Sequence, residues 1–101
     1  MKLTLEERHK RDARLVRRAR RGDQAAKAEL FEHYDKIAWK MALRYHSVSL
    51  TTEDLVQEAR FGLLDAIERW DPRRGVQFMT VAALWCLSLI HISEPTRPRL
   101  I

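Results

Sequence analysis

Residues 54–78 read DLVQEARFGLLDAIERWDPRRGVQF, and this stretch decides the fold. Its apolar residues recur every three or four positions, which is the period of one buried helix face. They are Leu55, Ala59, Gly62, Leu63, Ala66, Ile67 and Trp70. The helix should end near Trp70, because a residue that precedes proline, here Asp71, avoids helical geometry. We therefore predict a helix, a tight basic turn over residues 71–75, and a further helix after it.

Two smaller signals refine this helix. Thr51 and Asp54 are spaced like a capping box, so the helix should begin just after Thr51. Gly62 costs about 1 kcal/mol relative to alanine inside a helix. We expect it there so that another backbone can approach closely.

The chain before this stretch predicts two more helices. Residues 6–21 are rich in helix formers and arginine, Gly22 should end that helix, and Asp23 is a good N-cap for the next. Residues 24–45 carry apolar side chains at helical spacing, and residues 47–50 predict a short loop. The apolar face of residues 24–45 holds Leu30, Tyr34, Ile37, Met41 and Tyr45.

A fourth helix is predicted over residues 76–86, where Phe78, Val81, Ala82 and Trp85 share a face. The fold class expected from these elements is all-α. It is a compact bundle of about four helices with an irregular C-terminal tail.

Composition sets the wider limits. A chain of 101 residues is one small domain at most, and its net charge of +5 favours a polyanionic partner without indicating a fold. The single cysteine, Cys86, excludes an internal disulfide and a zinc site built from cysteines. Residues 1–21 contain no signal-peptide core, and no apolar run is long enough for a membrane helix. We therefore expect a cytoplasmic protein with no membrane partner.

The stretch of residues 54–78 closely resembles region 2 of the sigma-70 family of bacterial RNA polymerase sigma factors. The family pattern runs roughly D-L-[IV]-Q-E-G-x-x-G-L-x-x-A-[VI]-x-[KR]-[FW]-D-P-x-[RK]-G-x-x-F. With the upstream segment LVRRARRGDQAA, the resemblance covers about residues 15–86. It implies a helical module that binds core RNA polymerase and the promoter minus-ten element during transcription initiation.

The resemblance implies a docking surface for core polymerase. In the family, the helix with the D-L-V-Q-E segment docks on a coiled coil of the largest core subunit, and a polar, acidic edge suits a basic partner. Without the resemblance, Asp54 would be read as a helix cap, and Gln57 and Glu58 as solvated. Arg60 replaces the usual asparagine, and Ala59 the common glycine. The expected docking residues are Asp54, Leu55, Gln57, Glu58 and Arg60.

The resemblance also implies a surface for single-stranded promoter DNA. In the family, aromatic side chains that follow the basic turn stack on bases of the non-template strand. Such stacking contributes about 1–3 kcal/mol of binding free energy per base. Phe78 has a competing interpretation as a core residue, and a solvated turn would explain the two arginines equally well. Val81 and Leu84 stand where many members have tyrosine and tryptophan, which predicts weaker or retuned melting. The expected DNA-binding residues are Arg73, Arg74, Phe78, Thr80 and Trp85.

The C-terminal segment departs from the family pattern. We expect a helical region 2 domain over residues 1–86 and a tail outside the family over residues 87–101, disordered or artefactual. Residues 87–97, LSLIHISEPTR, resemble the translation of a widely used sequencing adapter. Our hypothesis is that the reading frame enters adapter sequence, and gene codons unlike the adapter would refute it.

Other classes of function fit the sequence less well. The four histidines are scattered, and no nucleophile motif or glycine-rich phosphate loop is present, so we expect no enzyme, no metal site and no cofactor. A helical interaction module or regulator that docks on polymerase without melting DNA is the main alternative. A generic basic DNA-binding protein is another. A separate anti-sigma factor remains a possible partner.

Overall fold

The computed structural model describes residues 2–46 and 51–93, and the side chains of residues 2–46 and 51–90. The described chain is all-α, which confirms the expected fold class. The loop expected at residues 47–50 and the tail from residue 94 lie outside the described residues. The helices are α1 (Leu5–Arg20), α2 (Gln24–Tyr45), α3 (Thr52–Arg69), the short 3-10 helix η1 (Pro72–Arg74) and α4 (Phe78–Ser93).

Local capping chemistry sets where the helices begin. The Thr4 hydroxyl and the Glu7 carboxylate form a reciprocal capping box at the start of α1. The Asp23 carboxylate accepts the backbone amides of Ala25 and Ala26 at the start of α2, as the sequence predicts. Between these helices Gly22 has a φ of +95°, a left-handed conformation that glycine adopts at little cost.

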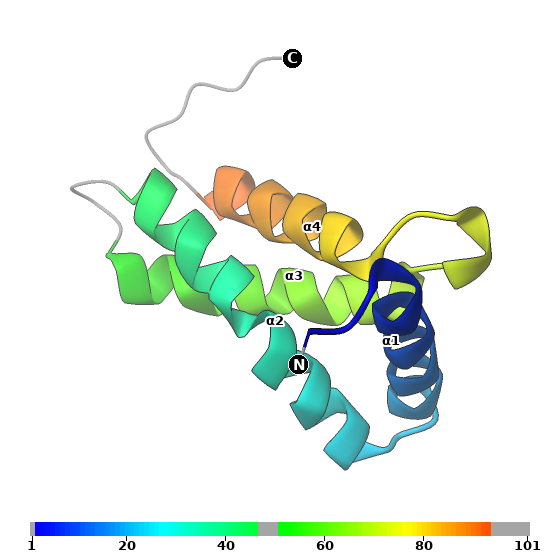
Figure 1. Ribbon diagram of the computed structural model, residues 1–101. Coiled ribbons are helices and arrows are strands. Elements are labelled where there is room, and N and C mark those ends of the chain that lie inside the picture. Colours follow the sequence, from blue (N-terminus) through cyan, green and yellow to red (C-terminus); the bar gives the residue numbers. More distant parts are fainter. Residues whose placement is uncertain (1, 47–50, 94–101) are drawn as a thin grey trace.

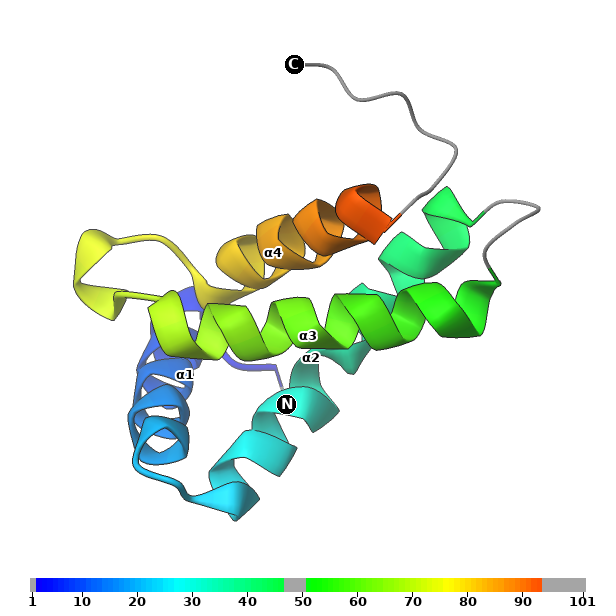
Figure 2. The same ribbon diagram turned by 180° about the vertical axis from the view of Figure 1, so that it is seen from behind.

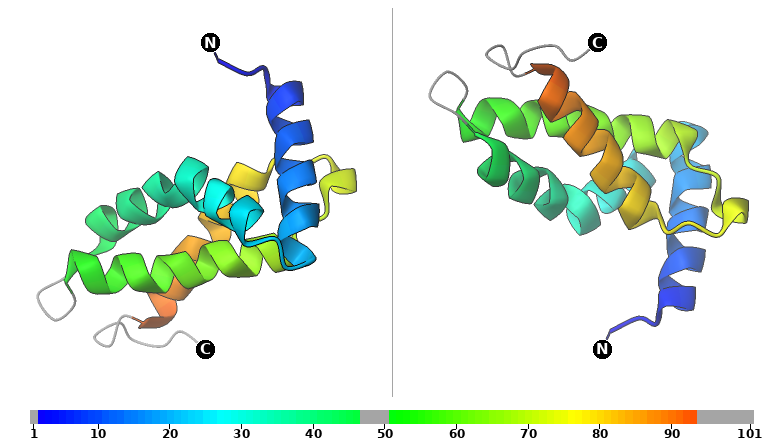
Figure 3. Two further views of the ribbon diagram at one scale, coloured as in Figure 1. Left: turned by 90° about the horizontal axis from the view of Figure 1, so that it is seen from below. Right: turned by 90° about the horizontal axis from the view of Figure 1, so that it is seen from above.

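The helices form a bundle in which α3 and α4 are antiparallel neighbours (Figure 1). α2 crosses them on one side, and the reverse view shows α3 in front of α2 (Figure 2). α1 stands against the end of α3 from which the basic turn projects, as the views from below and above agree (Figure 3). The turn and α1 therefore share one end of the molecule.

A single apolar core joins the four helices. Leu30, Tyr34 and Ile37 are buried as predicted, whereas Met41 and Tyr45 pack at the edge of the core. Its largest fully buried side chains include Phe78, Leu15, Leu30, Leu55, Leu63, Ile67 and Ile90.

At Gly62 the backbones of α3 and α4 approach closely. A β-carbon at Gly62 would lie 2.7 Å from the backbone nitrogen of Cys86. It would also lie 2.8 Å from the Cys86 α-carbon and from the carbonyl carbon of Trp85. The predicted reason for this glycine is confirmed, because only a residue without a β-carbon lets the backbones approach this closely.

α4 differs from the sequence prediction at both ends. It begins at Phe78 rather than residue 76, because the Val76 carbonyl accepts the Trp70 indole N–H and Gln77 supplies the first carbonyl that the helix uses. It continues to Ser93, past residue 86, where an irregular tail was expected. The reason is a stripe at every fourth position, Phe78, Ala82, Cys86 and Ile90, whose members are all buried.

Candidate functional site

One edge of α3 presents polar and apolar side chains to solvent. Asp54 and Gln57 are exposed, Glu58 is partly exposed, and Phe61 is 56% exposed. Their spacing of three and four residues places them on one helix face. The backbone amide of Asp54 donates to the Thr51 hydroxyl at 3.1 Å, so its carboxylate lies in the first helical turn.

Two other predicted docking residues have internal roles in this structure. Leu55 is 1% exposed and packs in the core, so it can orient the α3 edge but does not present its side chain to a partner. The Arg60 guanidinium forms two hydrogen bonds with the Asp35 carboxylate on α2, at 2.8 and 2.9 Å. This hydrogen bonding lowers the pKa of Asp35 below its usual range. Arg60 therefore fixes α2 relative to the α3 edge.

Phe61 was not among the predicted site residues. A large apolar side chain in the middle of a polar edge suits burial against a partner. The sequence could have indicated this position, since Phe61 stands four residues after Gln57 and so shares its helix face.

The basic turn after α3 is held by its own side chains. The Asp71 carboxylate accepts the backbone amide of Arg73 at 3.0 Å and its guanidinium at 3.1 Å. These bonds to Arg73 lower the pKa of Asp71. The Trp70 indole N–H donates to the Val76 carbonyl at 2.8 Å and so closes the turn from inside. Arg73 and Arg74 are consequently presented at the surface.

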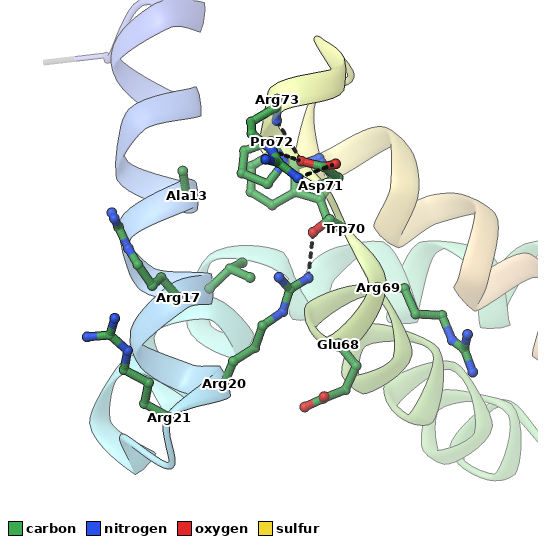
Figure 4. Close-up of a pocket in the computed structure, with 11 residues that line it drawn as sticks. Ala13, Arg17, Arg20, Arg21, Glu68, Arg69, Trp70, Asp71, Pro72 and Arg73 are labelled. Carbon is green, nitrogen blue, oxygen red and sulfur yellow. Dashed lines mark hydrogen bonds and ion pairs between the residues drawn. The ribbon is translucent and has the colours of Figure 1, made fainter.

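α1 contributes two side chains that hold this turn, and neither was predicted. The Arg20 guanidinium donates to the Ile67 carbonyl at 2.6 Å and also to the Trp70 carbonyl, across a groove between α1 and the turn (Figure 4). His9 Nε2 lies 2.9 Å from the Pro72 carbonyl oxygen, and the His9 ring meets the Trp70 ring edge-on. The Arg20 contacts satisfy carbonyls that the end of α3 leaves without helical partners, and the His9 contact satisfies a carbonyl of the turn itself.

α4 presents a mixed surface next to the turn. Thr80 and Leu84 are exposed, and Trp85 is half-buried. The guanidinium carbon of Arg69 lies 5.2 Å from the centre of the Trp85 ring, a cation–π distance. Figure 4 shows the Arg69 side chain directed away from the groove beside α1. A cation and a ring of the kind that stack on nucleic-acid bases therefore lie together.

Phe78, a predicted DNA-binding residue, lies in the core. It is 1% exposed, and its ring lies 5.3 Å from that of Trp70 and 5.2 Å from that of Tyr34. In this conformation its ring supports the turn and the start of α4 from beneath, which is the competing interpretation given above.

A buried polar cluster joins α1 and α2. The Asp12 carboxylate is fully buried, accepts the Tyr34 hydroxyl, and is bonded by the Arg11 guanidinium at 3.1 Å. Burial and the bond to Asp12 raise the pKa of the Tyr34 hydroxyl. The sequence held a signal for this cluster, since Asp12 stands in helical register with buried Leu15, Val16 and Ala19.

Within residues 2–46 and 51–93, no three histidine, cysteine, aspartate or glutamate side chains gather as a metal site would require. None of the helices in this part of the chain is long and apolar enough to cross a membrane.

Comparisons with known proteins agree on one family. The family model described as Sigma-70 region 2 matches residues 30–88. The chain is 36% identical over 82 residues to "RNA polymerase sigma factor RpoS" of Coxiella burnetii, covering 81% of this chain and 23% of that protein. It is 35% identical over 77 residues to "RNA polymerase sigma-C factor" of Myxococcus xanthus, covering 76% and 26%. The chain thus spans about a quarter of the length of these curated relatives.

Proposed function

This chain belongs to the sigma-70 family by its region 2, and on that premise we propose that it binds core RNA polymerase and the promoter minus-ten element in transcription initiation. The observation that carries the proposal is the pair of surfaces set by the α3–α4 hairpin. The polar edge of α3 and the turn with its α4 surface are carried by helices that pack in one core, so binding of one partner would position the other.

The α3 edge is proposed as the polymerase surface. Asp54, Gln57 and Glu58 offer carboxylates and an amide to a basic, polar partner, and Phe61 offers an apolar side chain among them. Complementary charge fixes register and orientation, while an aromatic side chain that becomes buried supplies affinity. Leu55 and Arg60 position this edge from the core and from α2.

The turn and α4 are proposed as the single-stranded DNA surface. Arg73 and Arg74 would contact phosphates, which strengthens binding without reading sequence. Trp85, with the Arg69 cation over its ring, would stack on an unpaired base, and Thr80 is exposed on the same helix. Phe78 would act indirectly by holding this surface in place.

A pull-down with core RNA polymerase tests the docking surface. The wild-type chain should be retained, and a Gln57→Ala/Glu58→Ala variant should be retained much less. Gln24→Ala/Glu32→Ala is a matched control, because it removes the same groups from exposed positions of α2. Equal retention of both variants would reject the proposed surface.

Binding to a single-stranded minus-ten oligonucleotide at a stated salt concentration tests the DNA surface. Trp85→Leu should weaken binding by roughly 1–3 kcal/mol, because it removes a stacking ring. Trp39→Leu is the control, since Trp39 is 39% exposed on α2, away from the turn. Equal losses in the two variants would contradict the assignment of Trp85.

A second candidate is a regulator that docks on polymerase without opening DNA. Leu84 favours it, because this aliphatic residue is 61% exposed on α4 where many family members carry tryptophan. Val81, in place of tyrosine, is also aliphatic. Retention on core polymerase with no measurable binding to the single-stranded oligonucleotide would favour the regulator.

A further inference from the structure

α1 and its C-cap residue Arg21 carry a row of cations that the proposed function does not use. Lys10, Arg14, Arg17 and Arg21 are all exposed, and their spacing of four, three and four residues places them on one face. At 1.5 Å per residue the row is about 16 Å long. We call these four residues the basic ridge.

The ridge cations differ from three other arginines of α1, which all have partners. Arg11 is paired with Asp12, Arg18 with Asp23, and the Arg20 guanidinium donates to backbone carbonyls. Among the described residues, none of the four ridge side chains forms an ion pair or a side-chain hydrogen bond. A charged surface helix usually carries alternating signs that neutralise one another, whereas this face has one acid, Glu6, followed by four cations.

The position of the ridge relative to the turn is fixed. Arg20 and His9 bind α1 to the carbonyls of Ile67, Trp70 and Pro72. A groove of about 650 Å³ separates Arg17 and Arg21 from Arg73. In Figure 4, Arg17 and Arg21 point outward from α1, and Glu68 lies on the opposite side of the groove. The groove lining holds Arg17, Arg20, Arg21, Arg69 and Arg73 besides Glu68 and Asp71, so cations outnumber acids between the ridge and the turn as well.

We infer that the basic ridge binds the phosphate backbone of duplex DNA next to the opened minus-ten element, an inference that rests on the proposed function. Proteins that bind single strands combine cations with exposed rings for stacking. In the described part of the chain, the exposed aromatic side chains are Trp39 on α2 and Phe61 on α3, and neither belongs to α1. A row of cations without rings suits a partner whose bases remain paired.

The salt dependence of binding tests this inference with the full chain. Arg14→Gln/Arg17→Gln/Arg21→Gln removes three ridge cations and keeps good helix formers. Lys36→Gln/Lys40→Gln/Arg44→Gln is the matched control, because it lowers the net charge equally from exposed positions of α2. Fluorescence anisotropy would measure the affinity for labelled duplex DNA and for the single-stranded minus-ten oligonucleotide at several salt concentrations.

We expect the ridge variant to bind duplex DNA with a shallower salt dependence. The slope of log K against log salt should fall by about 0.9 for each DNA phosphate that the variant no longer neutralises. The control should keep the wild-type slope, and single-strand binding should change in neither variant. If the triple variant did not fold, Arg14→Gln alone and Arg17→Gln alone should each reduce the slope by about 0.9.

Three results would contradict the inference that the basic ridge binds duplex DNA. These are equal slope changes in the ridge and control variants, an equal weakening of single-strand binding, or no duplex binding by the wild-type chain. Failure of the proposed function looks different: the wild type would then bind neither core polymerase nor the single strand, yet could retain a ridge-dependent duplex slope.

Discussion

Gly62 on α3 and Cys86 on α4 are in backbone contact, since a β-carbon on Gly62 would lie 2.7 Å from the Cys86 nitrogen. The Cys86 thiol also donates to the Ala59 carbonyl at 3.1 Å, one turn before Gly62. This contact sets the distance between the helices that carry the two proposed surfaces.

Gly62→Ala should therefore destabilise the protein. Alanine gains about 1 kcal/mol of helix propensity, but overpacking against a backbone costs typically 1–3 kcal/mol, so we expect a net destabilisation of roughly 1 kcal/mol. Urea unfolding followed by circular dichroism measures it. Adding Cys86→Ala should not restore stability, because the clash is with backbone atoms; a rescue would contradict this geometry.

Tyr34→Phe should remove a hydrogen bond to the buried Asp12 carboxylate. Bonds to charged groups contribute about 1.5–3 kcal/mol, so the free energy of unfolding should fall by that amount. A double-mutant cycle with Asp12→Asn isolates the pair and should give a coupling of roughly 0.5–3 kcal/mol. Strict additivity of the two changes would exclude a direct interaction.

Cys86 should make stability depend on alkaline pH. Burial raises the pKa of its thiol from 9.0 to about 12 in the folded chain. Because the folded pKa lies above the unfolded value, this stabilisation is complete below pH 9 and is lost as pH rises towards 12. The unfolding free energy of the wild type should fall over that range more steeply than that of Cys86→Ala. Parallel pH profiles would contradict the prediction.

The same thiol should resist chemical modification in the folded protein. Cys86 is fully buried, so a disulfide reagent near neutral pH should react far more slowly than it does in urea. A reaction rate that does not depend on urea would show that the α3–α4 contact opens readily.

Arg20→Lys should loosen the basic turn, although the charge is kept. The planar guanidinium donates to two carbonyls at once, whereas an ammonium group lacks this fork. We expect a destabilisation of about 1–2 kcal/mol and faster amide exchange at residues 70, 71 and 73–75. Arg21→Lys is the control for stability, because Arg21 is exposed and has no side-chain partner within the described ranges. An equal loss of stability in Arg21→Lys would contradict the role assigned to Arg20.

The boundary between α1 and α2 followed from short-range chemistry. Gly22 and Asp23 act within a few residues of their own positions, so the sequence was sufficient to place it, whereas the start of α4 was predicted two residues too early. The role of Gly62 could also be predicted, because glycine destabilises a helix interior and its presence there indicates close packing against another backbone. The end of α4 was predicted wrongly. Residues 87–92 are mostly apolar, so the spacing of apolar residues does not distinguish the buried position, Ile90, from its neighbours.

The candidate site was only partly accessible to sequence reasoning. The exposure of Gln57 follows from helical periodicity, which a sequence displays. The pairing of Arg60 with Asp35, and of Arg20 with the end of α3, depends on how helices meet, which periodicity does not encode. Phe78 illustrates the same limit, because a family pattern marks an aromatic position without saying which way the ring faces.

The different surroundings of two tryptophans give the protein separate optical reporters. Trp70 is 2% exposed within the ring cluster of His9 and Phe78, so its emission should follow unfolding. Trp85 lies partly open beneath the Arg69 cation, so its emission should respond to an arriving nucleotide base. With Trp39 replaced by phenylalanine, one fluorescence titration could follow the integrity of the core and the occupancy of the surface independently.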